Sequence, residues 1–257
     1  MEITSAQNPR IKHLLALQQK SQLRRQEGLF VVEGHRELEH CLRAGYQIEE
    51  LFLCPELAGE AALEANTIFT IPSSLYEKVA YRGSTEGVIA IVKERHFTLD
   101  DLKTGGKALI IVLERVEKPG NLGAVLRSAD AAGADAVIVC DPLTDLYNPN
   151  LIRSSIGAIF TVPTVACTSE ECIAFLQQHG ISILTAQLQD SNLYYDTDMR
   201  GPTAIVMGTE STGLTQQWRQ AATAHIRIPM LGQLDSLNVS VSAAILLFEA
   251  VRQRQTI

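Results

Sequence analysis

Short hydrophobic runs alternate with amphipathic stretches along the first part of the chain. Runs rich in β-branched and aromatic residues predict strands, and stretches with apolar residues at helical spacing predict helices. The predicted strands are 29–32, 48–54, 68–71 and 87–93, and the predicted helices are 9–25, 35–44, 58–65 and 73–79. This pattern indicates a small α/β module.

Residues 94–106 lose this periodicity and end in Gly105-Gly106, as a linker does. We therefore expect a first domain at 1–95, a linker at 96–106 and a second domain at 107–257.

A second run of alternating elements fills the rest of the chain. Predicted strands are 108–113, 136–140, 161–165, 182–186, 203–207 and 225–228, and predicted helices are 122–133, 149–157, 169–179, 214–222 and 240–253. Such alternation predicts an α/β domain with a mostly parallel sheet and helices on both faces.

Three segments of the second domain combine a hydrophobic run with glycine and a few polar residues. They are Asn-Leu-Gly-Ala-Val-Leu-Arg at 121–127, Ile-Val-Met-Gly-Thr-Glu-Ser-Thr-Gly at 205–213, and Ile-Pro-Met-Leu-Gly-Gln-Leu-Asp-Ser-Leu-Asn-Val at 228–239. Ligands bind at the carboxyl ends of parallel strands, so we expect these segments to share one pocket.

Composition excludes several classes of protein. The chain is 257 residues long and 46% hydrophobic, yet no stretch approaches the length of a membrane span. Its start lacks the apolar core of a signal peptide, so we expect a cytoplasmic location and no membrane partner. The five cysteines form no Cys-x-x-Cys pair, and the six histidines show no metal-like spacing. Neither a disulfide framework nor a zinc site is predicted.

Net charge of −7 argues against a nucleic-acid partner, but its distribution is uneven. Within residues 1–25, Glu2 is the one acidic residue, and the basic residues are Arg10, Lys12, Lys20, Arg24 and Arg25. This segment can serve as an electrostatic footprint for RNA or can simply be a solvated helix face.

The glycine patterns exclude two common cofactors. Gly120 and Gly123 do not complete a dinucleotide fingerprint, so NAD is disfavoured. The spacing from Gly208 copies a phosphate-binding loop, but Leu214 replaces its lysine and Glu210 would repel phosphate. A ligand without phosphate that uses backbone groups, a carboxylate and an apolar wall fits better, and S-adenosylmethionine has this profile.

The three segments resemble, in order and spacing, the signature motifs of the SpoU/TrmH group of RNA ribose 2′-O-methyltransferases in the SPOUT superfamily. Residues 147–160 are similar to a further Asn-Pro…Arg-x-Ser-x-Gly-Ala-x-Phe stretch of that family. The likeness covers residues 106–257. More weakly, residues 8–12, 30–34 and 87–90 resemble the family's N-terminal substrate-binding domain, whose fold is similar to a ribosomal RNA-binding protein.

This resemblance implies a one-carbon transferase that moves a methyl group from S-adenosylmethionine to an RNA ribose 2′-hydroxyl. It also implies a trefoil knot in the C-terminal domain, an active site at a homodimer interface and no metal. Ribosomal RNA is favoured over transfer RNA because the two-domain plan is that of ribosomal members. Alternatives are a transfer RNA methyltransferase, a methyltransferase acting on a base or small molecule, and a non-catalytic RNA-binding or assembly factor.

The resemblance also implies residue roles. Arg127 is expected to activate the hydroxyl, either as a base or by holding the neighbouring phosphate. Other expected active-site residues are Asn121, Glu210, Ser236 and Asn238. Backbone groups around Gly208, Ile228 and Leu237 are expected to hold the cofactor. Arg153 is expected to contact RNA, together with Arg10, Lys12, Arg24 and Arg25.

Structural roles compete with these assignments. Asn121 suits a helix N-cap, and Ser236 and Asn238 can cap the final helix. Glu210 can favour the N-terminus of the following helix, and Arg127 and Arg153 can be solvated surface residues.

Overall fold

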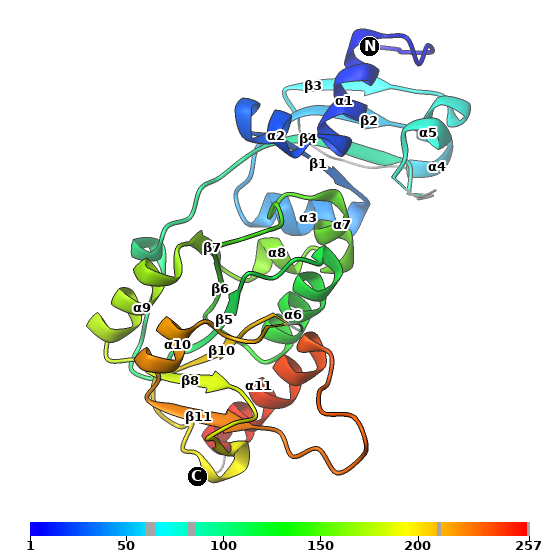
Figure 1. Cartoon of the computed structure of the whole chain (residues 1–257). Helices are drawn as coiled ribbons and strands as arrows, with labels where there is room; N and C mark the ends of the chain where they lie inside the picture. Colours follow the sequence, from blue (N-terminus) through cyan, green and yellow to red (C-terminus); the bar gives the residue numbers. More distant parts are fainter. Residues whose placement is uncertain (60–64, 82–85, 210–211, 256–257) are drawn as a thin grey trace. The chain divides into compact units, whose positions relative to one another are not determined.

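Two units make up the chain in the computed structural model, which describes residues 1–59, 65–81, 86–209 and 212–255 (Figure 1). The N-terminal unit comprises Met1–Arg95 together with Asp145–Thr161. The C-terminal unit comprises His96–Thr144 and Val162–Ile257. The domain boundaries expected from the sequence stay a prediction.

The N-terminal unit begins with two helices where the sequence predicted one. Asn8 caps α1 (Pro9–Gln19), and its Oδ1 accepts a hydrogen bond from the Arg10 amide at 2.8 Å. Extended backbone at Lys20 then separates α1 from α2 (Ser21–Glu27). Arg24 stabilises this break because its Nη1 donates to the carbonyls of Leu17 and Gln18, at the carboxyl end of α1.

A four-stranded mixed sheet forms the centre of the N-terminal unit. Its strands are β1 (Leu29–Glu33), β2 (Ile48–Leu53), β3 (Thr67–Thr70) and β4 (Val88–Lys93), in the order β1-β4-β2-β3. β4 pairs antiparallel with β1 and β2, whereas β2 and β3 are parallel. The remaining helices are α3 (His35–Arg43), α4 (Pro55–Ala58), α5 (Ser73–Val79), α7 (Pro149–Ser154) and α8 (Ala158–Thr161). Most of the helix predicted at 58–65 lies outside the described residues.

A seven-stranded sheet forms the centre of the C-terminal unit. Its strands are β5 (Leu109–Glu114), β6 (Ala136–Cys140), β7 (Thr164–Cys167), β8 (Ser182–Ala186), β9 (Asn192–Leu193), β10 (Thr203–Met207) and β11 (Ala224–Arg227). The order is β7-β6-β5-β10-β8-β11-β9, and every neighbouring pair is parallel. The predicted parallel α/β sheet is therefore confirmed. The knot implied by the resemblance stays a prediction.

Helices pack in two pairs against this sheet. α6 (Pro119–Ala131) contacts α11 (Val239–Gln255), and α9 (Ser169–Gln178) contacts α10 (Gln216–Ala221). Figure 1 shows the two pairs on opposite faces. Alternate side chains of each strand serve the two faces, so Ile110 and Val112 join Trp218 in the core beneath α9 and α10. Two short 3₁₀ turns, η1 (Leu99–Asp101) and η2 (Tyr194–Asp196), complete the unit.

The sequence pattern misplaced or missed several short elements. The strand predicted at 161–165 lies at Thr164–Cys167, because α8 extends to Thr161. β9 is too short to show a two-residue period and is held by pairing with β11. Among the described helices, none is long and apolar enough to cross a lipid bilayer.

Candidate active site

A cavity of about 480 Å³ opens at the carboxyl ends of β8, β10 and β11. The residues that follow these strands line it, beginning with Gln187, Gly208 and Ile228. The segment before α11 and the first turns of α11 form another wall, with Ser236, Leu237 and Leu246. The cavity therefore occupies the edge of a parallel sheet where ligands bind.

Gly208 is required by the close return of its own loop. A Cβ atom placed on Gly208 would lie 2.3 Å from the carbonyl carbon of Gly213 and 2.5 Å from the amide nitrogen of Leu214. The amide of Gly213 donates to the carbonyl of Thr209 at 3.1 Å, which fixes the return. Only glycine fits where two backbone segments approach this closely.

A smaller cavity of about 120 Å³ shares Gly208, Thr209 and Val239 with the larger one. Asn121 lines this smaller cavity, and Arg115, Glu117 and Lys118 contribute charged groups. Asn238 Nδ2 donates a hydrogen bond to Asn121 Oδ1 at 3.2 Å. The three sequence segments at 121–127, 205–213 and 228–239 therefore meet around two adjoining cavities.

The structure shows which of the polar residues cap helices. Asn121 is not an N-cap, because α6 begins at Pro119 with Lys118 in the cap position. Asn238 does cap α11, since its Oδ1 accepts from the amide of Ser240 at 2.9 Å. The same side chain also bonds Asn121, so its two roles are compatible. Among the described residues, the Ser236 side chain caps no helix, and its hydroxyl donates to Asp235 Oδ1 at 3.3 Å.

Two further expected residues lie apart from this arrangement. Arg127 is exposed on α6 and lines neither cavity, and its side chain makes no hydrogen bond or ion pair within the described part of the chain. Its guanidinium is therefore open to solvent. Glu210 lies outside the described residues. Of the expected cofactor residues, Gly208, Ile228 and Leu237 all line the larger cavity.

The expected RNA-binding residues all belong to the N-terminal unit, but their environments differ. Arg24 is 3% exposed, and its Nε donates to Asp145 Oδ2 at 2.7 Å. Arg10 pairs with Glu50, whereas Lys12 and Arg25 are exposed. Arg153 is exposed, donates to the Tyr81 carbonyl at 3.0 Å and lines a cavity of about 370 Å³. The structure commits Arg24 to the interior and leaves the other four basic groups at the surface.

Gln187 is a cavity residue that the sequence reasoning missed. Its Nε2 donates to the Gln189 carbonyl at 2.9 Å, but its buried Oε1 has no hydrogen-bond partner among the described residues. A buried acceptor without a partner costs free energy unless a ligand supplies a donor. Its position directly after β8 could have identified Gln187, because a residue that follows a parallel strand lies where ligands bind. The segment lacks the glycine that marks the three sequence segments.

Glu114 holds a loop of the larger cavity in place, and the sequence motifs did not indicate it. It is 1% exposed at the end of β5, and its Oε2 accepts from the amide of Thr215 at 2.9 Å. Its Oε1 accepts from the Thr215 hydroxyl at 2.6 Å. Thr215 follows Leu214, which lines the larger cavity, so this buried carboxylate fixes one end of the cavity loop. A glutamate ending a hydrophobic strand gives no distinctive sequence signal.

Two protein-family models match this chain. Residues 108–248, more than half of the chain, match the SpoU rRNA Methylase family. Residues 8–90 match the MRM3-like substrate binding domain. The chain belongs to the SpoU rRNA methylase family, as the three motifs predicted.

Individual relatives extend the similarity over the whole chain. The chain is 28% identical to the 23S rRNA (guanosine(2553)-2′-O)-methyltransferase RlmP of Bacillus subtilis, over 96% of this chain and 98% of that protein. A crystal structure of an RNA 2′-O ribose methyltransferase is 41% identical and has a TM-score of 0.86, with 99% of each chain covered. The AdoMet-bound rRNA methyltransferase of Sinorhizobium meliloti is 29% identical, has a TM-score of 0.89, and covers 98% of this chain and 97% of its own.

The bond between Asn238 and Asn121 gives a test that separates capping from site geometry. Asn238→Ala removes both functions, so we expect a loss of about 1 kcal/mol in the free energy of unfolding. Asn238→Asp keeps the capping oxygen but loses the donor, so its stability should stay near that of the wild type. Loss of the donor should lower methyl transfer about fivefold in both variants, equivalent to about 1 kcal/mol. Chemical denaturation and initial rates measure the two effects, and full activity in Asn238→Asp would contradict the positioning role.

Proposed function

We propose that this protein transfers a methyl group from S-adenosylmethionine to a ribose 2′-hydroxyl in RNA, with ribosomal RNA as the favoured substrate. The observation that carries the proposal is the convergence of the three motif segments around two adjoining cavities, joined by the Asn238 to Asn121 hydrogen bond. Membership of the SpoU rRNA methylase family and the printed activities of the full-length relatives support it.

The larger cavity has the properties that the methyl donor needs. Its volume of about 480 Å³ falls in the usual range for small-molecule sites. Apolar side chains from Met207, Ile228 and Leu237 face it, and the Gln187 Oε1 offers a buried acceptor for an amino group. Bound S-adenosylmethionine supplies an electrophilic methyl group on a positively charged sulfur. The AdoMet-bound structure from S. meliloti supports the same cofactor here.

The protein's own residues then have to orient and activate the RNA hydroxyl. A ribose hydroxyl is a weak nucleophile, so placement and proton removal supply most of the catalysis. Asn121 lies in the smaller cavity and is held by Asn238, which places an amide beside the junction of the two cavities. Arg127 carries a charge that no described residue neutralises, and its planar guanidinium suits the phosphate beside the ribose. Ser236 and Glu210 complete the proposed active-site residues.

A homodimer is part of this proposal. Large apolar side chains are exposed before and along α11, among them Leu231 at 96% and Leu234 at 76% exposure. Val241 and Phe248 are each 47% exposed on α11 itself. Exposed apolar surface of this kind is typical of an interface. Because Arg127 lines neither cavity of its own chain, a second copy offers a route for it to reach the reacting groups.

We propose that the N-terminal unit recruits RNA through Arg10, Lys12, Arg25 and Arg153, and that the enzyme acts in the cytoplasm. Arg24 is left out because it is buried, with Asp145 and the carbonyls of α1 around its guanidinium. The trefoil knot belongs to the same proposal.

The function is tested by incubating the protein with methyl-labelled S-adenosylmethionine and either ribosomal or transfer RNA. Nucleoside mass spectrometry should place the label on ribose, and ribosomal RNA should be the better acceptor. Label on a base, or no transfer with intact cofactor binding, would support the alternative functions instead. Mapping sites of alkaline cleavage resistance in ribosomal RNA, with and without the gene, then identifies the modified nucleotide.

Gln187 provides a prediction for the cofactor site. Gln187→Leu should raise the Kd for S-adenosylmethionine about tenfold, because it deletes the buried acceptor, which corresponds to about 1.4 kcal/mol. Without ligand, its thermal stability should be unchanged or higher, since the wild-type oxygen lacks a partner among the described residues. Calorimetry measures both, with Gln216→Leu, at an exposed residue of α10, as the matched control. An unchanged Kd would remove Gln187 from the cofactor site.

A further inference from the structure

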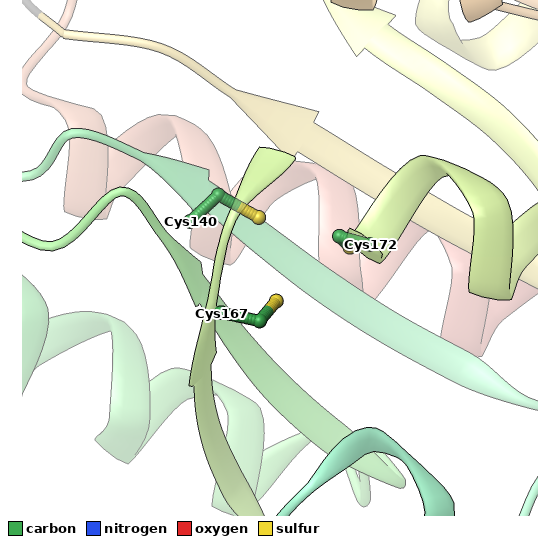
Figure 2. A group of neighbouring side chains, drawn as sticks. All are labelled: Cys140, Cys167 and Cys172. Carbon is green, nitrogen blue, oxygen red and sulfur yellow. The ribbon is translucent and has the colours of Figure 1, made fainter. Parts of the chain in front are cut away.

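Three cysteines converge at one edge of the C-terminal sheet, away from the motif segments in sequence. Cys140 ends β6, Cys167 ends β7, and Cys172 lies in α9. Their sulfur atoms all lie within 4.8 Å of one another. Figure 2 shows the three side chains gathered between the ends of the two strands and the start of the helix.

The backbone of the fold produces this convergence. Cys140 and Cys167 are register partners in the parallel β6–β7 pair, so their side chains lie next to each other on one face. Thr168 then caps α9, and a reciprocal bond between Thr168 and Glu171 fixes the turn that brings Cys172 over the strand ends. The sequence predicts no zinc site because these cysteines form no Cys-x-x-Cys pair. Strand register joins Cys140 to Cys167, and the turn into α9 adds Cys172.

We propose that Cys140, Cys167 and Cys172 bind one thiophilic metal ion of the Zn(II) class, with water as the fourth ligand. Tetrahedral coordination at a metal–sulfur distance of about 2.3 Å needs sulfur atoms about 3.8 Å apart. The observed triangle, with edges of 4.8 Å or less, reaches that size through small side-chain rotations. Cys140 and Cys172 are fully buried while Cys167 is half-buried, so the ion and the water approach from the Cys167 side.

The surroundings of the cluster favour thiolate ligands. The N-terminal end of α9 adds a positive potential next to the sulfur atoms, and a divalent ion would leave three thiolates with a net charge of only −1. On binding, the ion takes the place of the three thiol protons, which are released to solvent.

The nearby carboxylates are already engaged, which is why water is assigned to the fourth position. Asp141 Oδ2 accepts from the Ser169 hydroxyl at 2.6 Å, and Glu171 Oε2 accepts from the Thr168 hydroxyl at 2.8 Å. Sulfur ligands also exclude Ca²⁺ and Mg²⁺, which prefer oxygen. A disulfide between two of the cysteines is the competing outcome, but it would leave the third thiol unused.

The experiment measures metal binding by the full-length, reduced protein after chelator treatment. Zn(II) affinity is obtained by competition with a chromophoric chelator, and Co(II) reports coordination through its thiolate charge-transfer and ligand-field absorption. We expect one ion per chain and a tetrahedral Co(II) spectrum. Cys167→Ser and, separately, Cys172→Ala should each weaken Zn(II) binding by about 10²-fold or more. Cys54→Ala, a buried cysteine of the N-terminal unit, is the matched control and should bind as the wild type does.

Three results would overturn the proposal. The first is the absence of stoichiometric Zn(II) binding by the reduced protein. The second is equal affinity in Cys167→Ser and the wild type, with circular dichroism showing that both are folded. The third is a disulfide between two of the three cysteines in the air-oxidised protein, found by peptide mass spectrometry, in a protein whose reduced form does not bind Zn(II). Because these readouts involve no methyl transfer, they are independent of the proposed function.

Discussion

Replacing Arg127 with alanine is expected to lower turnover by about 10²-fold or more, while the affinity for S-adenosylmethionine stays nearly unchanged. The side chain lies exposed on α6 and lines neither cavity, so its loss removes no contact with the cofactor pocket. It does remove the cation that we propose to activate the ribose hydroxyl or to hold the neighbouring phosphate. Single-turnover methyl transfer and calorimetry with S-adenosylmethionine measure the two quantities separately.

Two further variants sharpen this test. Arg127→Lys keeps a point charge but loses the planar fork, so partial recovery of activity would favour an electrostatic clamp on phosphate. Arg200→Ala is the control, because Arg200 is an exposed arginine of the same unit paired with Asp198. Wild-type turnover in Arg127→Ala would remove this residue from the mechanism.

Adding a single methyl group at Gly208 is expected to disrupt the cofactor site. The new Cβ atom would lie 2.3 to 2.5 Å from backbone atoms of Gly213 and Leu214, and backbone cannot move aside as a flexible side chain can. Overpacking of this kind costs about 1–3 kcal/mol of stability. We also expect the Kd for S-adenosylmethionine to rise by about tenfold or more, because the displaced loop forms one wall of the cavity.

Thermal unfolding and calorimetry of Gly208→Ala measure these effects. Gly201→Ala is the matched control, since a Cβ atom there meets no heavy atom within 4 Å. If Gly208→Ala bound the cofactor as tightly as Gly201→Ala, the close loop passage would have no part in forming the site.

Arg127→Ala and Gly208→Ala together test the proposed homodimer. If each active site takes Arg127 from one copy and the cofactor pocket from the other, mixing the two impaired proteins under exchange conditions should restore part of the activity. Activity that stays at the level of the separate variants, with exchange verified by native mass spectrometry, would indicate that each chain supplies its own arginine.

The sequence predicted most of this fold because its signals are local. Buried parallel strands are continuous runs of β-branched residues, as at Leu109–Glu114 and Thr203–Met207, and such runs are visible without any tertiary information. Helix starts were visible for the same reason, as at Asn8 and Pro9. The predicted first helix is broken at Lys20. There the side chain of Arg24 donates hydrogen bonds to the carbonyls of Leu17 and Gln18 at the end of α1. The helix preference of each residue taken singly gives no indication of this contact.

The candidate site divides in the same way. By itself, the sequence determined the parallel α/β class, the three motif segments and the choice of a cofactor without phosphate, because glycine spacing and hydrophobic runs are properties of neighbouring residues. Tertiary structure alone decided that Asn238 bonds Asn121, that Gln187 faces the cavity, that Arg24 is buried, and that three cysteines meet. These contacts depend on strand order and register, which bring together groups far apart along the chain. Hydrophobic periodicity records which face of an element is buried, but not which distant residue it meets there.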